Sequence, residues 1–135
     1  MFDRHAQSKL RSQGQAALAV IDPAVPHADC LAEAAAPRVG IVRPDAGGGD
    51  RVAKALAYAE APVRTLHLVS HGAPGRLTLG GADLDAKALA ERGRRWRRHL
   101  APDATIVLYG CSAGRGEAGR DLVRKLARAT GARVL

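Results

Sequence analysis

The sequence predicts a three-layer α/β domain, in which helices cover both faces of a mostly parallel sheet. Short apolar segments alternate with helix-length segments along the 135 residues, and this alternation is typical of a parallel sheet. Turn residues close each apolar segment. The chain is 47% hydrophobic but only 3% aromatic, so its core must consist of Ala, Val, Leu and Ile. Such residues suit thin strands covered by Ala-rich helices, and the length is that of one domain.

Turn residues divide the first half of the chain into predicted elements. An opening polar segment, 1–15, is expected to be flexible, and 16–135 to form the domain. The first apolar run ends at Asp22-Pro23, which predicts a buried strand closed by a turn. Asp50 precedes a helical stretch and is a predicted N-cap. The elements expected here are strand 16–21, helix 27–36, strand 38–43, helix 51–60 and strand 63–70.

The second half continues the alternation after one insertion. Residues 76–85 alternate in polarity and contain Gly80-Gly81, which predicts a small hairpin. Asp85 is the predicted N-cap of the next helix, and Thr130-Gly131 ends the last one. A flavodoxin-like strand order, 2-1-3-4-5, suits this pattern. The remaining elements are helix 86–100, strand 104–109, a helix near 117–129 and strand 132–135.

Two of the predicted strands end at chemically active residues. His71-Gly72 follows the strand 63–70, and Gly110-Cys111 follows the strand 104–109. Because the carboxyl ends of parallel strands share one edge of a sheet, we expect His71 and Cys111 to meet there. A thiolate is a nucleophile, and a neighbouring imidazole can accept and return its proton. Taken singly, each residue has an ordinary structural explanation, but their joint placement favours a catalytic pair.

The surroundings of Cys111 suit the same chemistry. The helix that follows it would favour the thiolate through its N-terminal dipole. The backbone N–H groups of Gly72 and Cys111 are candidate donors to an oxyanion. Gly72 and Gly110 would also let a substrate backbone approach closely. Asp22 and Asp45 follow the first two strands and are expected at this edge as well.

Several segments carry a family resemblance. An apolar strand ending in His-Gly, followed by one ending in a small residue and Cys, is similar to the caspase, gingipain and separase group of cysteine peptidases. From about residue 17 to its end, the chain resembles DUF4347 more closely. That bacterial domain is usually found at the N-terminus of very large surface or secreted adhesin-like proteins. The segments that carry the resemblance are 18–22, 66–72, 77–80, 108–111 and 116–119.

The resemblance implies a caspase-like cysteine endopeptidase with His71 as general acid/base and Cys111 as nucleophile. Its substrate would be a peptide or protein, as in self-processing or maturation of a secreted or cell-surface protein. In that fold Asp22 would line the substrate pocket and favour a basic side chain at the cleaved position. Family members generally continue past the fifth strand, whereas this chain ends at Leu135, which implies a truncated substrate groove. The alternative is a catalytically inactive interaction module with a basic binding face.

Other motifs lead to weaker alternatives. Residues 110–114 match G-x-S-x-G, but an α/β-hydrolase needs a histidine after its serine and none follows Ser112. The glycine-rich runs 47–49 and 114–116 fit neither nucleotide-binding fingerprint, so caps and turns explain them better. His67 and His71 lack a third ligand for a metal. We therefore expect no metal and no cofactor.

The charge of the chain permits a second kind of partner. The formal net charge is +8 and the isoelectric point about 10.5, a balance that allows attraction to nucleic acid or anionic surfaces without establishing it. The segment most suited to such binding is the basic tail of the helix 86–100, where Trp96 would take part together with Arg94, Arg95, Arg97 and Arg98. The opening residues lack the apolar core of a signal peptide, and no run reaches the roughly 18 apolar residues of a membrane span. Cys30 is expected to be a free thiol in the core.

Overall fold

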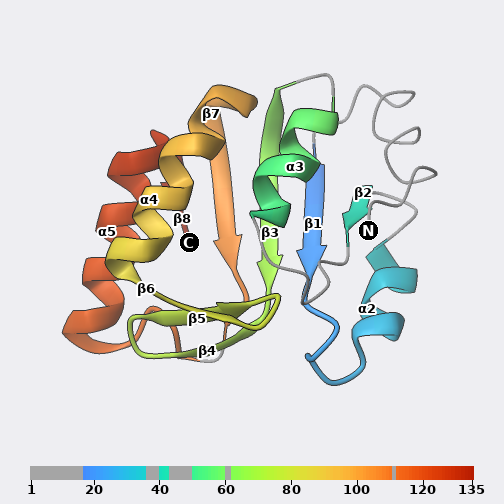
Figure 1. The fold of residues 1–135 in the computed structure, drawn as a ribbon, viewed down its shortest axis with the longest axis horizontal. Helices are drawn as coiled ribbons and strands as arrows, with labels where there is room; N and C mark the ends of the chain where they lie inside the picture. The colour runs from blue at the N-terminus through green and yellow to red at the C-terminus, as the bar shows by residue number, and fades with distance from the viewer. Residues whose placement is uncertain (1–16, 36–39, 43–49, 60–61, 111) are drawn as a thin grey trace.

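A computed structural model describes residues 17–35, 40–42, 50–59, 62–110 and 112–135 of the chain (Figure 1). A five-stranded sheet in the order β2-β1-β3-β7-β8 forms its centre, and every pair of neighbouring strands is parallel. The predicted N-terminal segment, Asp45 and the run 47–49 lie outside the described residues. The strands of this sheet are β1 (Ala17–Ile21), β2 (Gly40–Val42), β3 (Val63–Val69), β7 (Leu100–Leu108) and β8 (Arg133–Val134).

A second, antiparallel sheet lies at the carboxyl edge of the first, beneath the tips of the β3 and β7 arrows in Figure 1. It contains the predicted hairpin, β5 (Arg76–Leu79) and β6 (Ala82–Asp85), together with a further strand, β4 (His71–Ala73). Gly80 and Gly81 join β5 to β6 with φ of 58° and 84°. Positive φ at both positions is what a two-residue hairpin turn of the primed type requires, and glycine adopts it without strain.

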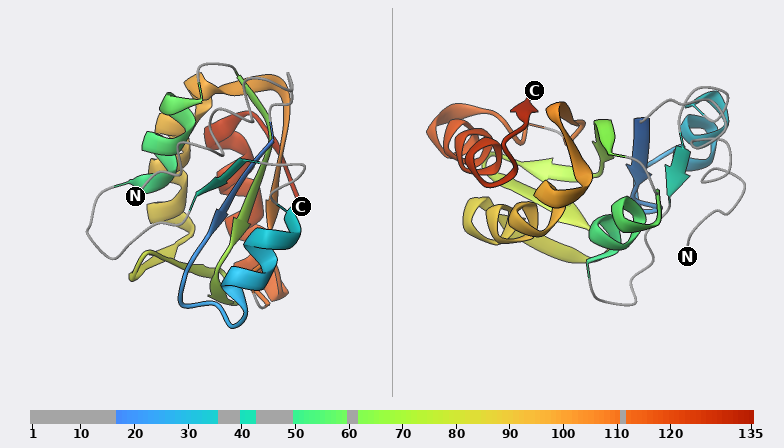
Figure 2. Two further views of the ribbon diagram at one scale, coloured as in Figure 1. Left: turned by 90° about the vertical axis from the view of Figure 1, so that its right-hand side faces the viewer. Right: turned by 90° about the horizontal axis from the view of Figure 1, so that it is seen from above.

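The helices begin and end largely where capping residues predict. Asp50 accepts a hydrogen bond from the Ala53 N–H (3.0 Å), and Asp85 accepts one from the Ala88 N–H (2.9 Å). Gly131, with φ 72°, ends the last helix in the left-handed conformation. In Figure 2, α3 and α4 lie on one side of the large sheet and α2 on the other. The helices are α2 (Ala28–Ala35), α3 (Arg51–Tyr58), α4 (Ala86–Trp96), the 3₁₀ helix η1 (Arg97–His99) and α5 (Gly116–Thr130).

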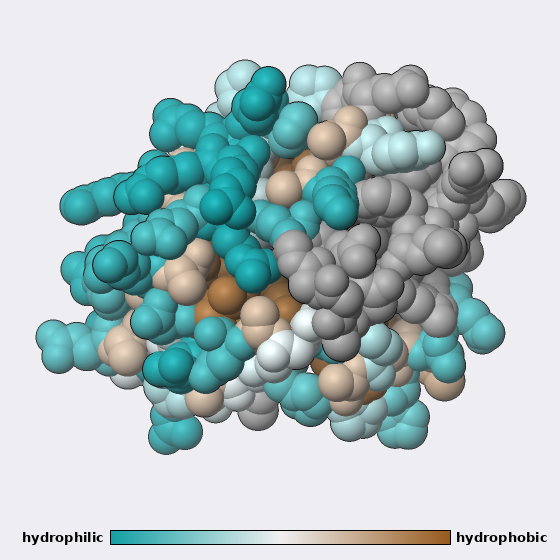
Figure 3. Space-filling view, in the orientation of Figure 1, coloured by the Kyte–Doolittle hydropathy of each residue, from teal (hydrophilic) through white to brown (hydrophobic). Residues whose placement is uncertain are grey.

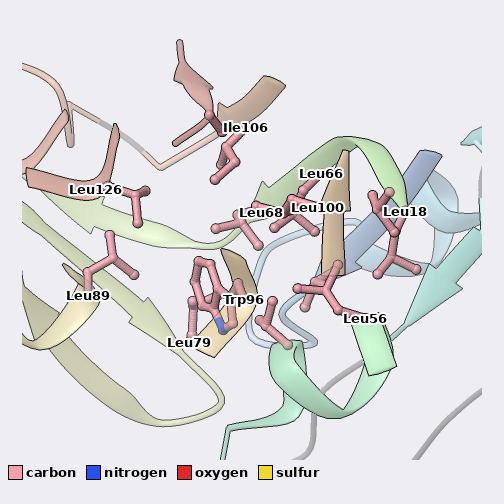
Figure 4. Close-up of a cluster of buried hydrophobic side chains, with 14 of the residues drawn as sticks. Leu18, Leu56, Leu66, Leu68, Leu79, Leu89, Trp96, Leu100, Ile106 and Leu126 are labelled. Carbon is pink, nitrogen blue, oxygen red and sulfur yellow. The ribbon is translucent and has the colours of Figure 1, made fainter. Parts of the chain in front are cut away.

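The core lies between the large sheet and helices α3, α4 and α5. Trp96 lies at the centre of this core and is 0% exposed (Figure 4). Its indole Nε1 donates a hydrogen bond to Asp50 Oδ2 at 2.9 Å. The expectation that Trp96 helps a surface patch bind is therefore wrong: its indole faces the core. Burying a large apolar side chain stabilises a fold by about 1.5–3 kcal/mol. The other large, fully buried side chains are Leu18, Ile21, Leu56, Leu66, Leu68, Leu77, Leu89, Ile106, Leu122 and Leu126.

The connection from α4 to β7 differs from the expected one. The helix ends at Trp96 rather than near residue 100, and β7 begins at Leu100 rather than at residue 104. The register of β3 and β7 shifts at this point, from Val63 opposite Leu100 to Thr65 opposite Thr105. A bulge of this kind accommodates Pro102, which has no N–H to give to a regular ladder.

Candidate catalytic site

His71 begins β4 at the carboxyl edge of the large sheet, and its side chain is exposed. Its Nε2 atom lies 2.9 Å from the carbonyl oxygen of Ala24. A carbonyl oxygen only accepts hydrogen bonds, so Nε2 must be the donor. In a neutral imidazole the other nitrogen, Nδ1, then carries no proton. This hydrogen bond therefore selects the tautomer whose Nδ1 can accept a proton.

A tight turn directly after β1 presents the Ala24 carbonyl to His71. Asp22 Oδ1 accepts from the Ala24 N–H at 2.9 Å, and the Asp22 carbonyl accepts from the Val25 N–H at 3.0 Å. The Asp22 N–H in turn donates to the Val69 carbonyl at the end of β3, at 2.8 Å. Aspartate favours such turns because its short side chain reaches the backbone two residues on. The sequence signal for this turn is Asp22-Pro23, although the acceptor itself is a backbone atom.

The second carboxylate oxygen of Asp22 ties the same turn to the small sheet. Oδ2 accepts from the Gly80 N–H at 2.9 Å, across 58 positions of sequence. Asp22 is only 3% exposed, so both oxygens face backbone N–H groups of the protein itself. A buried carboxylate needs such partners, because an unpaired one would be costly. Asp22 is thus a buried part of the turn whose Ala24 carbonyl contacts His71. Its role in a substrate pocket stays a prediction.

Cys111 lies outside the described residues, but the chain on both sides of it is described. The Tyr109 N–H donates to the Leu68 carbonyl at 2.9 Å, which continues the pairing of β7 with β3 up to Tyr109. On the far side, the Ala113 carbonyl accepts from the Gly75 N–H of the β4–β5 turn at 2.9 Å. Ser112 adopts φ 61°, a left-handed conformation that costs a non-glycine residue about 1 kcal/mol. The loop that carries Cys111 is therefore attached to β3 before the cysteine and to the β4–β5 turn after it.

Two glycines allow β4 to approach the segment that follows β7 closely. A Cβ atom added to Gly72 would lie 3.1 Å from both the Cα and the carbonyl carbon of Gly110. A Cβ added to Gly110 would collide with the Leu77 side chain and lie 3.3 Å from the Ala113 Cβ. The absence of side chains at Gly72 and Gly110 thus lets β4 and the segment after β7 pack against each other. The expectation that they admit a substrate backbone is not needed to explain them.

A turn separates Cys111 from the last helix, α5, which begins at Gly116. The first turn of α5 packs directly on this loop, since a Cβ added to Gly119 would collide with the backbone of Gly114. The helix carries Glu117 in its first turn, an acidic residue that suits the positive end of a helix dipole. Residues 112–115 are thereby held against α5 as well as against the β4–β5 turn.

The comparison with protein families identifies the chain. Residues 18–135 match the domain of unknown function DUF4347. The chain belongs to this family. Searches of curated proteins and of solved structures found no match. The match includes both strand ends of the candidate site, so His71 and Cys111 are part of the DUF4347 domain itself.

A second histidine of the DUF4347 domain lies near the site on β3. His67 Nδ1 is 3.0 Å from the hydroxyl of Tyr109, and the two rings are 5.7 Å apart between centroids. Burial lowers the pKa of His67 below its ordinary value of 6.5. Within the described part of the chain, no group of three or more His, Cys, Asp or Glu side chains could hold a metal ion.

The residues of the basic segment 94–99, at the end of α4 and in η1, have different environments. Arg94, Arg95 and Arg98 are exposed. Arg97 Nη1 donates to the Arg128 carbonyl at 3.4 Å, so this guanidinium lies over the last turn of α5, where cations complement the dipole. Desolvation, aided by the charge of Arg98, lowers the pKa of His99. Arg97, one of the four arginines predicted to bind a partner, thus links η1 to α5.

Two further expectations concern the burial of Cys30 and the presence of a membrane span. Cys30 is a free thiol but lies on the exposed side of α2, so its expected place in the core is wrong: in this short helix Ala28 is buried in its stead. None of the helices among the described residues is both long and apolar enough to traverse a bilayer.

Proposed function

We propose that the DUF4347 domain is a caspase-like cysteine peptidase with His71 and Cys111 as its catalytic pair. The adjacency of β3 and β7 in the order β2-β1-β3-β7-β8 supports this assignment, because these strands lead to the two residues. The close approach of Gly72 to Gly110 supports it further, since Gly72 directly follows His71 and Gly110 directly precedes Cys111 in the sequence. The observation that carries the proposal is the hydrogen bond from His71 Nε2 to the Ala24 carbonyl.

In the proposed reaction, Nδ1 of His71 takes the proton of the Cys111 thiol. The thiolate attacks the peptide carbonyl, and the resulting oxyanion accepts hydrogen bonds from the backbone N–H groups of Gly72 and Cys111. The imidazolium then gives its proton to the leaving amine, and the C–N bond breaks to leave a thioester. A water molecule then loses a proton to Nδ1 and attacks the thioester carbonyl. The C–S bond breaks to release the new carboxyl terminus, and the imidazolium returns its proton to the sulfur to restore the thiol.

The Ala24 carbonyl would contribute at the imidazolium stage. A carbonyl oxygen that accepts from Nε2–H stabilises the positive ring more than the neutral one, because hydrogen bonds to ionised groups are the stronger ones. It also keeps the ring from turning away while Nδ1 is protonated. The substrate would be a peptide or protein, such as a neighbouring part of a surface or secreted protein. A basic residue at the cleaved position remains the expectation for the pocket near Asp22.

A thiol-directed peptidyl probe tests the proposal, and the chain offers its own control. Cys30 is an exposed free thiol, so a probe that merely seeks thiols would label it. We expect Cys30→Ser to be labelled like the unaltered protein and Cys111→Ala to escape labelling. His71→Ala should slow labelling of Cys111 by at least about a hundredfold, the usual contribution of a general base. Equal labelling of Cys111→Ala, or an unchanged rate in His71→Ala, would remove the catalytic pair.

A further inference from the structure

The net charge of this protein is confined to its last fifty residues. Residues 1–85 contain nine Lys or Arg and nine Asp or Glu, so they contribute no net charge. Residues 86–135 contain twelve Lys or Arg and four Asp or Glu, which accounts for the whole formal charge of +8. A general compositional bias towards arginine would spread over the chain. This concentration instead marks one region of the fold, that of α4, η1 and α5.

A groove of about 440 Å³ runs between α4 and α5, which lie side by side in Figures 1 and 2. The two helices pack closely because Gly93 has no side chain: a Cβ there would come within 2.9 Å of Leu126 and Thr130. Over this part of the molecule, at the left of Figure 3, the surface is mostly hydrophilic with small apolar areas between the charged side chains. The groove is lined by Lys87, Ala90, Glu91, Arg94, Lys125, Arg128 and Ala129.

Cations stand on both sides of the groove. Lys87 and Arg94 come from α4, and Lys125 and Arg128 come from α5. Lys125 Nζ is 3.1 Å from Asp121 Oδ2, in a pair that is about half exposed. Within the part of the chain that the structure describes, the other three cations make no ion pair. A ligand with negative groups along its length would therefore find unused positive charge on both walls.

The floor of the groove limits what that ligand can be. Its buried floor residues, Ala90 and Ala129, leave room for a chain segment but give no aromatic surface. Single-stranded nucleic acids depend on stacking against aromatic rings, and the single tryptophan of this protein is buried. Among the described residues, the exposed large apolar side chains lie outside α4 and α5, so these helices have nothing to insert into a bilayer.

Glu91 distinguishes the remaining candidates. It lies in the groove between Lys87 and Arg94, four and three residues away along α4. A uniformly negative ligand such as a duplex backbone would be repelled by this carboxylate. A polypeptide can instead place a lysine or arginine opposite it, among acidic residues that pair with the four cations. Complementary charges of both signs fix the register of a partner.

We propose that the α4–α5 groove binds an acidic segment of a partner protein, with one basic residue of that segment paired to Glu91. The groove lies on the helix layer, whereas the candidate catalytic site lies at the sheet edge. This binding therefore does not depend on the proposed peptidase activity.

Fluorescence anisotropy with labelled peptides tests the groove. The probes are a glutamate-rich peptide containing one lysine, whose position is scanned, and the same peptides with glutamine in place of that lysine. We expect the double variant Arg94→Ala/Arg128→Ala to weaken binding about tenfold, since each pair of this kind contributes a factor of a few. The matched control is Arg95→Ala/Arg120→Ala, which removes the same charge from exposed positions outside the groove and should weaken binding less than about threefold.

Glu91→Gln then separates the two kinds of ligand. It should weaken the best lysine-containing peptide and strengthen its glutamine counterpart, because only the former pairs with the carboxylate. Equal losses in the two arginine double variants would overturn the proposal and indicate attraction by net charge alone. Tighter binding of a DNA duplex than of any peptide, strengthened further by Glu91→Gln, would also overturn it.

Discussion

Replacing Asp22 by alanine is expected to destabilise the fold strongly. The carboxylate accepts two hydrogen bonds of 2.9 Å, from the Ala24 and Gly80 N–H groups, and is 3% exposed. Each hydrogen bond to such a group contributes about 1.5–3 kcal/mol, and the stranded N–H groups carry a further cost. Relief from burying a carboxylate offsets part of this sum. We expect a net loss of about 3 kcal/mol, a large share of the 5–15 kcal/mol by which domains are usually stable.

Urea unfolding followed by tryptophan fluorescence measures this loss, because the single tryptophan, Trp96, is buried. The matched control is Asp83→Ala, which removes an exposed carboxylate 3.0 Å from Arg76 and should lower stability far less. Asp22→Asn keeps the shape but turns one acceptor into a donor that faces an N–H group, so it should lose nearly as much as Asp22→Ala. Similar small losses in all three variants would refute the reasoning.

The same variant should also affect the candidate site. Without Asp22 the Ala24 carbonyl is no longer held in its turn, and His71 loses its fixed partner. Under conditions where Asp22→Ala is folded, probe labelling of Cys111 should slow, whereas Asp83→Ala should label at the original rate. Unchanged labelling in a folded Asp22→Ala would show that the turn does not position His71.

Three further variants test local features of the fold. Asp50→Ala removes both a helix cap and the hydrogen-bond partner of the Trp96 indole, so it should lower the free energy of unfolding in urea by about 2 kcal/mol. Asp85→Ala removes a cap alone and should lower it by about 1 kcal/mol. Gly119→Ala would push a Cβ into the Gly114 backbone and should cost about 2–4 kcal/mol, whereas Gly114→Ala meets nothing closer than 3.9 Å and should be tolerated; equal melting temperatures would contradict this. Burial lowers the pKa of His67 in the folded state. As the pH falls through the ordinary histidine pKa of about 6.5, the unfolded chain therefore takes up a proton at His67 more readily than the folded protein does. The free energy of unfolding should thus fall as the pH drops from about 7 towards 5. His67→Phe should flatten that dependence, with His99 leaving a residual slope of the same sign.

Local sequence determined most of the secondary structure. Asp50 and Asp85 cap their helices as expected, because capping depends only on a side chain and an N–H group three residues on. The paired glycines at 80 and 81 mark a hairpin for the same local reason. Deviations occur where long-range packing decides, as in the early start of β7, where pairing with β3 draws Pro102 into a bulge.

The candidate site was predictable in part. Strand ends that share a sheet edge follow from parallel pairing, so the sequence alone directs attention to His71 and its surroundings. It does not reveal that His71 is held by the Ala24 carbonyl, because every residue has a carbonyl and none signals its use. Likewise, an aspartate before proline predicts a turn but not that its second oxygen reaches Gly80.

What the sequence by itself determined is therefore the set of elements, their alternation and the chemical identity of the residues at their ends. Only the tertiary structure decided that Trp96 is core rather than surface and that the cations of two helices border one groove. The physical reason is range. Caps, turns and periodicity are set by neighbours along the chain, whereas burial and convergence of charge depend on which distant segments pack together.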